Sequence, residues 1–240
     1  MRFSIIFPSR ERVGLLTDLL ESIKNNTQLL HEVEVLIYID QDDSDSYMFL
    51  RKSTAMKIYP FMRYFSGVRS QPPNFSRDYY NFLAKQSTGR WIIAANDDCR
   101  FETSGWDVLA YDILKEKPGV IYGYSEDGLG ANRAPGHGNY CCFPLVGRKG
   151  YDALGYYFPE RIPTWGCDIW MKGLYDQIGS NVILPITIRH YTSHNGTRAM
   201  DHINRRIATS QVKYSVYPQY DEINILLKTL QEDQKLVGAK

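Results

Sequence analysis

The run TGRWIIAANDD occupies residues 88–98. Its segment 91–95 is apolar at every position, which is typical of a strand covered by helices on both faces of a sheet. The three residues that follow are Asn96, Asp97 and Asp98. Ligands in open α/β sheets bind at the carboxyl ends of the strands. The run therefore predicts a buried strand of an α/β sheet with a polar site at its end.

Segments on both sides of this run alternate between strand-like and helix-like patterns. Residues 3–7 and 33–40 are apolar enough for two more buried strands, and the weaker stretch 58–65 is a candidate third. Leucines recur at helical spacing after the first strand, and Ser9 is expected to cap that helix. The alternation predicts an α/β fold with a mostly parallel sheet. Further helices are expected at 78–87, 106–117, 168–178 and 222–236, and further strands at 120–124 and 182–188.

Residues 125–166 lose this periodicity and are rich in glycine and aromatic side chains. A long irregular segment inside a compact domain is usually a functional loop. Aromatic faces suit sugar rings and nucleobases, and ordinary core packing is the alternative explanation for them.

The composition is that of an ordinary globular protein of 240 residues, and we expect one domain over 1–240. Lys+Arg total 28 and Asp+Glu total 27, so the net charge is +1. This balance argues against a protein that wraps nucleic acid. The opening MRFSIIFPSR has too short an apolar run for a signal peptide, and no membrane span is expected. The four cysteines lack zinc-site spacing. We therefore expect a cytoplasmic protein with reduced thiols.

A second predicted strand end is also acidic, because the strand at 33–40 ends in Asp40 and is followed by Asp42 and Asp43. Neighbouring parallel strands would bring both acidic clusters to one edge of the sheet. Carboxylate oxygens at such an edge suit Mg²⁺ or Mn²⁺. The alternative is an Asx-rich turn that does no more than end each strand.

Several motifs, taken in order, resemble those of the GT-A glycosyltransferases. They are Pro8-Ser-Arg10-Glu-Arg12, Ile39-Asp40-Gln-Asp42-Asp43, the run 88–107, Trp165-Gly-Cys-Asp168-Ile-Trp170 and Ile188-Arg-His190. The sequence is most similar to the small, family-two-like enzymes found in bacteriophage genomes, and the likeness extends to about residue 205. This resemblance implies a nucleotide-diphosphate sugar donor, a Mn²⁺ or Mg²⁺ ion and transfer to an acceptor hydroxyl. It divides the domain into a donor-binding half (1–100), an acceptor-side and catalytic half (101–206) and a C-terminal helical extension (207–240).

The resemblance also implies roles for single residues on the donor side. Asn96 stands where the family's Asp-x-Asp motif has its first aspartate, which leaves Asp98 as the expected metal ligand. His190 is the expected second ligand, in preference to His194. The alternatives are a surface charge for Arg10, a turn residue for Asp40 and a structural histidine for His190. The expected nucleotide-sugar contacts are Pro8, Ser9, Arg10, Asp40, Asp42, Asn96 and Asp97.

On the acceptor side, the resemblance makes Asp168 the general base that takes the proton of the attacking hydroxyl, and attack with a single base is expected to invert the anomeric centre. From the residues alone, Asp168 fits a helix N-cap as well. Trp165 and His137 are expected to contact the acceptor. The acceptor is either a modified base in DNA or a glycan, and a viral origin would place the enzyme in the host cytoplasm.

Three other functions compete with this one. A nucleotidyltransferase needs a glycine-rich phosphate loop after the first strand, where this chain has Phe7-Pro-Ser-Arg10. A dinucleotide oxidoreductase needs a third glycine where Gly128-Leu-Gly130-Ala-Asn-Arg133 has arginine. A non-catalytic module that binds a sugar or nucleotide is consistent with the asparagine at position 96.

Overall fold

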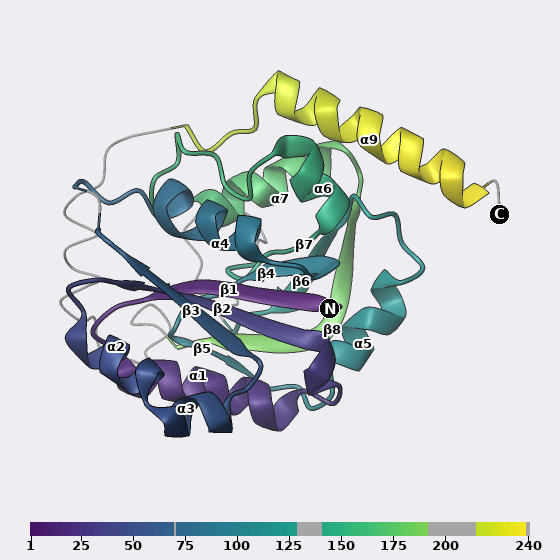
Figure 1. Ribbon diagram of the computed structural model, residues 1–240. Coiled ribbons are helices and arrows are strands. Elements are labelled where there is room, and N and C mark those ends of the chain that lie inside the picture. Colours follow the sequence, from purple (N-terminus) through teal and green to yellow (C-terminus); the bar gives the residue numbers. More distant parts are fainter. Residues whose placement is uncertain (70, 129–140, 192–214, 239–240) are drawn as a thin grey trace.

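The computed structural model describes residues 1–69, 71–128, 141–191 and 215–238. Its described part is a three-layer α/β arrangement in which one curled sheet lies between two groups of helices (Figure 1). The strands are β1 (Phe3–Ser9), β2 (Val33–Asp40), β3 (Met62–Gly67), β4 (Trp91–Ala94), β5 (Cys99–Phe101), β6 (Tyr122–Glu126), β7 (Leu145–Gly147) and β8 (Asn181–His190). Their order in the sheet is β3-β2-β1-β4-β7-β6-β8-β5.

The helices cover both faces of this sheet. One face carries α1 (Val13–Asn26), α2 (Ser44–Arg51), α3 (Ser53–Ile58) and α5 (Trp106–Leu114) (Figure 1). The other face carries α4 (Phe82–Gln86), α6 (Arg148–Leu154), α7 (Cys167–Gln177) and α9 (Tyr220–Gly238). Two short helical segments complete the described elements, the 3₁₀ turn η1 (Leu30–Glu32) and the π-helix η2 (Ser76–Asn81), which continues directly into α4.

The first half of the sheet is parallel, as the sequence predicts, because β1 pairs in parallel with both β2 and β4, and β2 pairs in parallel with β3. The second half is mixed. β7 runs antiparallel to β4 and to β6, β6 is parallel to β8, and β5 is antiparallel to β8. β5 and β7 have three residues each, which is too short for an alternating pattern to stand out in the sequence.

Alternate residues of the central strands enter different cores. Trp91 and Ile93 of β4 pack with the residues of α1 and α5, whereas Ile92 and Ala94 pack with those of α4, α7 and α9. The core on the second face includes Trp170 of α7 and Leu226 of α9. Both faces of the strands are therefore covered, which explains why residues 91–95 are apolar at every position.

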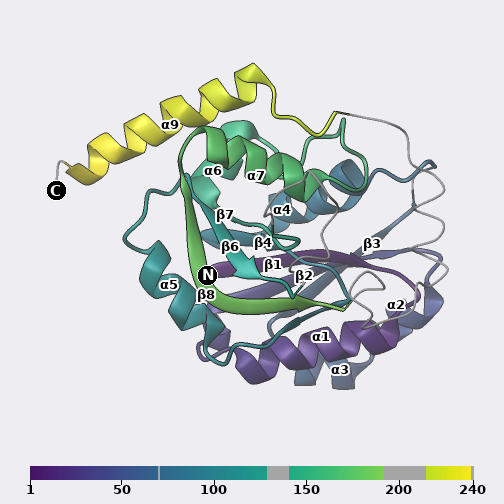
Figure 2. The ribbon, with the colours of Figure 1, turned by 180° about the vertical axis from the view of Figure 1, so that it is seen from behind.

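Several element boundaries differ from the prediction. Helix α1 begins at Val13 with Arg12 at the N-cap position, so the expected Ser9 cap is wrong, and Ser9 belongs to β1 instead. The third strand is 62–67 rather than 58–65, because residues 53–58 form α3. The C-terminal helix extends from Tyr220 to Gly238 and lies over α6 and α7, as the view from behind also shows (Figure 2). No helix in the described ranges combines the length and apolarity that a bilayer crossing needs.

Candidate active site

The ends of β1, β2 and β4 meet at one edge of the sheet, because these strands are parallel neighbours. The Ser9 hydroxyl, at the end of β1, donates a hydrogen bond to Asp97 Oδ2 at 2.9 Å. Pro8 lies within β1, opposite Tyr38 of β2. The expectation that the two acidic clusters share an edge is therefore confirmed. We call this region the acidic edge, which comprises Asp40, Asp42, Asn96, Asp97 and Asp98.

Arg10 binds two carboxylates of the acidic edge. Its Nη1 donates to Asp40 Oδ2 at 3.0 Å, and its Nη2 donates to Asp42 Oδ2 at 2.9 Å. The hydrogen bond between Arg10 and Asp42 raises the pKa of the guanidinium and lowers the pKa of the carboxyl group. Asp40 is buried and accepts a second hydrogen bond, from the Tyr79 hydroxyl at 2.7 Å. Arg10 therefore joins the loop after β1 to the end of β2 and is not an isolated surface charge.

Asn96 contacts the η2 helix. The Tyr80 hydroxyl lies 2.7 Å from Asn96 Oδ1 and 2.9 Å from the Ala95 carbonyl oxygen. Burial raises the pKa of Tyr80 well above its ordinary value, so this hydroxyl stays protonated. A neutral amide at position 96 makes this contact without adding a third charge beside Asp97 and Asp98.

Asp97 connects the end of β4 to the loop after β1. Its Oδ1 accepts a hydrogen bond from Arg12 Nη1 at 2.9 Å, and its Oδ2 accepts the bond from Ser9. The carboxyl group is almost fully buried. Burial raises its pKa to about 6, against the opposing effect of the Arg12 charge. Both oxygens of Asp97 are thus engaged by the chain itself.

Asp98 faces His190 across a short antiparallel ladder. Cys99 of β5 pairs with His190 at the end of β8, and the Tyr191 amide donates to the Asp98 carbonyl oxygen at 2.8 Å. His190 Nε2 lies 3.2 Å from Asp98 Oδ1, and both side chains are mostly buried. The structure therefore brings together the two residues that the sequence predicts as metal ligands, whereas His194 lies outside the described residues.

The chemistry of this pair fits a divalent cation. A carboxylate oxygen and an imidazole nitrogen at hydrogen-bond distance are both ligands that Mn²⁺ accepts. Within the described ranges, no group of three His, Cys, Asp or Glu side chains gathers around one point. Asp98 and His190 would thus supply two protein ligands, which leaves further coordination positions for phosphate oxygens and water.

Asp168 lies in the first turn of α7. The N-cap position belongs to Gly166, which has a φ of 96°, so the N-cap interpretation of Asp168 is wrong. The Asp168 carboxylate is half-buried, and its Oδ1 accepts a hydrogen bond from the Ile169 amide at 2.9 Å. A negative charge in a first helical turn is favoured by the helix dipole.

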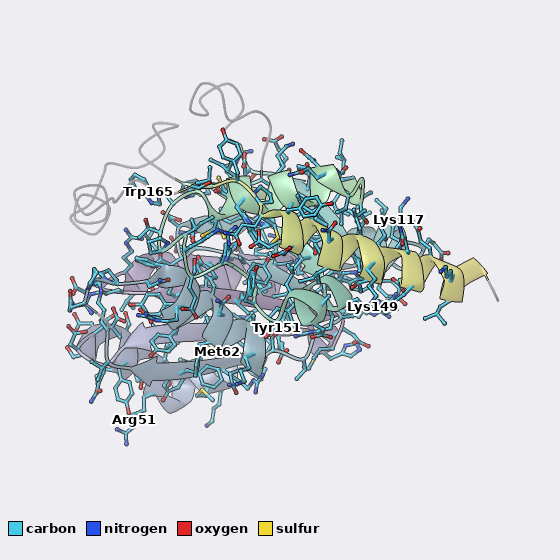
Figure 3. The ribbon with its side chains drawn as sticks, turned by 90° about the horizontal axis from the view of Figure 1, so that it is seen from above. Arg51, Met62, Lys117, Lys149, Tyr151 and Trp165 are labelled. Carbon is cyan, nitrogen blue, oxygen red and sulfur yellow. The ribbon has the colours of Figure 1, made fainter. Side chains whose placement is uncertain are left out.

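The η2 helix links α7 to the acidic edge. Ser76 Oγ is 3.3 Å from Cys167 Sγ, one residue before Asp168, while Tyr80 of the same short helix contacts Asn96. The first turn of α7 and the acidic edge therefore lie against opposite ends of one element. Trp165 lies just before α7 and is 45% exposed (Figure 3). The other predicted acceptor contact, His137, lies outside the described residues.

Sequence reasoning did not assign roles to three side chains that hold this region together, namely Arg12, Tyr79 and Tyr80. Arg12 is part of the motif that begins at Pro8, and its place in that motif could have indicated that it lies at the site. The two tyrosines occur in an ordinary amphipathic segment, and only the fold reveals which carboxylate or amide each one meets.

No protein-family model matches the chain, and no curated protein is a significant match. Solved structures do match it. Residues 1–349 of TarS from S. aureus, in complex with UDP, have 13% sequence identity and a TM-score of 0.61, over 81% of this chain and 62% of that one. This chain thus spans less than two thirds of that structure's length. The mannosyltransferase PcManGT from Pyrobaculum calidifontis, with GDP-Man and Mn²⁺, has 13% identity and a TM-score of 0.62, over 99% of this chain and 75% of that one.

The chain has the GT-A fold. A further similar structure, GalNAc-T7 with UDP, GalNAc and Mn²⁺, has 12% identity and a TM-score of 0.56, over 79% of this chain and 43% of that one. At identities this low the likeness concerns the fold. The sequence likeness to bacteriophage enzymes stays a prediction.

Proposed function

We propose that this protein is a glycosyltransferase that moves a sugar from a nucleotide-diphosphate sugar to an acceptor hydroxyl. The observation that carries the proposal is the meeting of the acidic edge with His190 at the carboxyl ends of the parallel strands of a GT-A sheet. Solved structures of the same fold contain UDP, GDP-Man or UDP-GlcNAc, which supports this class of donor.

The proposed donor site combines Pro8 and Ser9 at the end of β1, and Arg10 directly after it, with the acidic edge. Arg10 and Tyr79 orient Asp40, and Arg12 and Ser9 orient Asp97. These bonds restrict the side chains before a ligand arrives, which lowers the entropy lost on binding. Asp42 is largely exposed, and it is proposed to contact the nucleoside end of the donor.

Asp98 and His190 are the residues that would hold a Mn²⁺ or Mg²⁺ ion. Such an ion would supply Lewis-acid stabilisation of the charge that grows on the departing nucleotide diphosphate. Two of the similar structures contain Mn²⁺, which supports this assignment.

Asp168 is the proposed general base. Its carboxylate would accept the proton of the acceptor hydroxyl while that oxygen attacks the anomeric carbon and the bond to the nucleotide diphosphate breaks. One attack of this kind inverts the configuration of the sugar. Trp165 and His137 are proposed to contact the acceptor, which is either a base in DNA or a glycan.

All four cysteines are free thiols, which supports the predicted cytoplasmic location.

The proposal is tested by titrating UDP-GlcNAc, UDP-glucose and GDP-mannose into the protein with Mn²⁺ and with EDTA. We expect one donor to bind with Mn²⁺, to raise the melting temperature and to be slowly hydrolysed to free nucleotide. A chain that binds none of these donors and releases no nucleotide contradicts the proposal.

A non-catalytic sugar- or nucleotide-binding module is the second candidate, because the amide of Asn96 replaces the first carboxylate of the expected motif. The same titration separates the two functions. A module binds the donor and never releases the nucleotide, whereas an enzyme turns it over.

A further inference from the structure

A buried carboxylate joins the start of the C-terminal helix α9 to the domain. Glu222 lies in the first turn of α9 and is 4% exposed. Its Oε1 accepts hydrogen bonds from the Tyr156 hydroxyl and from Arg161 Nη1, both at 2.6 Å. Its Oε2 accepts hydrogen bonds from Arg161 Nη2 at 2.8 Å, from Trp170 Nε1 at 3.1 Å and from the Gln219 amide at 2.6 Å.

All but one of these donors belong to the segment that carries the proposed acceptor-side residues. Tyr156 and Arg161 lie in the loop between α6 and α7, and Trp170 lies in the first turns of α7. Trp165 and Asp168 are thus enclosed in sequence between two partners of Glu222. The remaining donor, Gln219, is the residue before α9, so Glu222 also satisfies the amide that precedes its own helix.

The opposite side of the same loop is bound to η2 and its neighbours. The Phe75 amide donates to the Pro163 carbonyl at 2.6 Å, and Asn81 Nδ2 donates to the Phe158 carbonyl at 2.8 Å. Tyr80 of the same helix η2 contacts Asn96, so η2 lies between this loop and the acidic edge. The loop is therefore held from the donor side by η2 and from the other side by Glu222.

The segment just before α9 packs directly on the start of α7. A Cβ atom on Gly166, the N-cap residue of α7, would lie 2.6 Å from Val216 Cγ1, and one on Gly173 would lie 3.4 Å from Pro218. The Tyr217 carbonyl accepts a hydrogen bond from Arg161 Nη2 at 3.4 Å. Residues 215–219 therefore follow the surface of the first turns of α7.

Attachment of α9 to the domain does not itself require a buried charge at this position. Leu226 and Leu230 already place the apolar face of α9 in the core that contains Trp170. A second buried carboxylate, Asp233, binds Lys149 and the Gly119 amide near the other end of the helix. Burying an ion pair contributes little net stability, because the loss of hydration offsets the attraction. The position of the Glu222 bonds is therefore more informative than their strength.

We propose that Glu222 is a positioning residue, which fixes the loop 156–166 and the first turn of α7 so that Trp165 and Asp168 keep their places relative to the acidic edge. The catalytic part of this inference rests on the proposed function. Misplacement of a reacting group by about 1 Å can lower a rate about a hundredfold. Loss of the hydrogen bonds of Glu222 is therefore expected to lower the turnover number.

The test compares Glu222→Gln with Asp233→Asn in the full chain. Both substitutions neutralise a buried carboxylate of α9, but only Glu222 contacts the loop and α7. The exposed Asp221→Asn, also in the first turn of α9, is the control for loss of charge alone. The melting temperature of every variant is recorded, so that a change in hydrogen exchange or turnover can be separated from a general loss of stability.

The first readout is hydrogen exchange of the amides of residues 161–170. We expect Glu222→Gln to increase their exchange about tenfold or more, and Asp233→Asn and Asp221→Asn to leave it near wild type. Equal exchange in the Glu222 and Asp233 variants would overturn the positioning role, and this readout needs no substrate.

The second readout is hydrolysis of UDP-GlcNAc with Mn²⁺, together with the affinity for UDP. We expect Glu222→Gln to lower the turnover number about tenfold to a hundredfold while the Kd for UDP stays within about twofold of wild type. An unchanged turnover number would overturn the catalytic part of the inference. If wild-type protein turns over no nucleotide sugar at all, the proposed function fails, and hydrogen exchange still decides whether Glu222 positions the loop.

Discussion

Asp97 and Asp98 are neighbours in the chain, but their side chains meet different partners. Asp97 contacts Ser9 at the end of β1 and Arg12 in the loop after it, and Asp98 contacts His190 of β8. The first carboxylate thus holds two segments of the protein together, and the second is the one proposed to bind an ion.

Two substitutions of Asp97 are expected to lower the free energy of unfolding by different amounts. Asp97→Ala removes the ion pair of the mostly buried Arg12 and should lower the free energy of unfolding by about 3 kcal/mol. Asp97→Asn keeps one acceptor oxygen for Arg12, and its NH2 group can donate to the Ser9 hydroxyl, so it should lower the free energy of unfolding by about 1 kcal/mol. Urea unfolding of both variants at pH 7 measures the difference. Equal losses would mean that the hydrogen bonds kept by asparagine contribute nothing and that the whole effect comes from the lost charge.

His190→Ala is expected to weaken the affinity for Mn²⁺ about tenfold to a hundredfold, the scale on which metal sites lose support. The imidazole is 3.2 Å from Asp98 Oδ1, so its removal takes away one of the two proposed ligands. The measurement is Mn²⁺-dependent binding of UDP by calorimetry. His194→Ala is the comparison variant, and greater sensitivity of that variant would move the ligand role to position 194.

At the scale of elements, the capping of helix α7 and the proposed catalytic role of its first turn belong to different residues. Gly166 occupies its N-cap position with a positive φ, a conformation that suits glycine because it has no Cβ. Asp168 is therefore released from a capping role and lies one residue beyond Cys167, which contacts η2.

Asp168→Asn is expected to lower sugar transfer by at least about a hundredfold, because an amide cannot accept the proton of the acceptor at neutral pH. Its size is unchanged and the cap belongs to Gly166, so the melting temperature should stay near that of the wild type. Donor affinity should also be unchanged, since the proposed donor site is the acidic edge. Transfer and donor binding are measured on the same preparation. Near-normal transfer would leave Asp168 without a role as base.

At the scale of the whole molecule, two buried carboxylates of the C-terminal helix, Glu222 and Asp233, contact the rest of the domain. Burial acts to raise the pKa of Glu222, but the hydrogen bonds from Arg161, Gln219, Tyr156 and Trp170 outweigh it, so the pKa lies below its usual value. The pKa of Asp233 is likewise lowered, because the bonds from Lys149 and Gly119 and the charges of Lys149 and Arg90 outweigh burial.

We expect acidification to weaken the packing of α9 on the domain without releasing the helix, because its apolar face stays buried. A carboxyl group with a lowered pKa in the folded chain stabilises the fold while it is ionised. This stabilisation is complete above the ordinary pKa values of 4.5 and 3.8 and is lost as the pH falls through the lower folded values. Hydrogen exchange of the α9 amides, corrected for the intrinsic effect of pH, is measured between about pH 6 and about pH 3. Protection that is unchanged over this range would contradict the anchoring role of the two carboxylates.

The sequence alone determined the parallel half of the sheet and the place of the candidate site. The strands at 3–7, 33–40 and 91–95 are visible because burial on both faces leaves a continuous apolar run, and a polar residue stands out where each run ends. The order of the motifs also selected Asp98 and His190, which the structure brings within 3.2 Å. Their role as metal ligands and the role of Asp168 as a base stay predictions.

Only the tertiary structure decided which side chains hold this site in place. Tyr79 and Tyr80 meet Asp40 and Asn96, and Glu222 meets partners more than 50 residues earlier in the chain. The strands β5 and β7 and the mixed half of the sheet also emerged only there. Helical and strand patterns arise from neighbours in the chain and leave a period in the sequence. Contacts between distant segments leave no period, because they depend on how whole elements pack against one another.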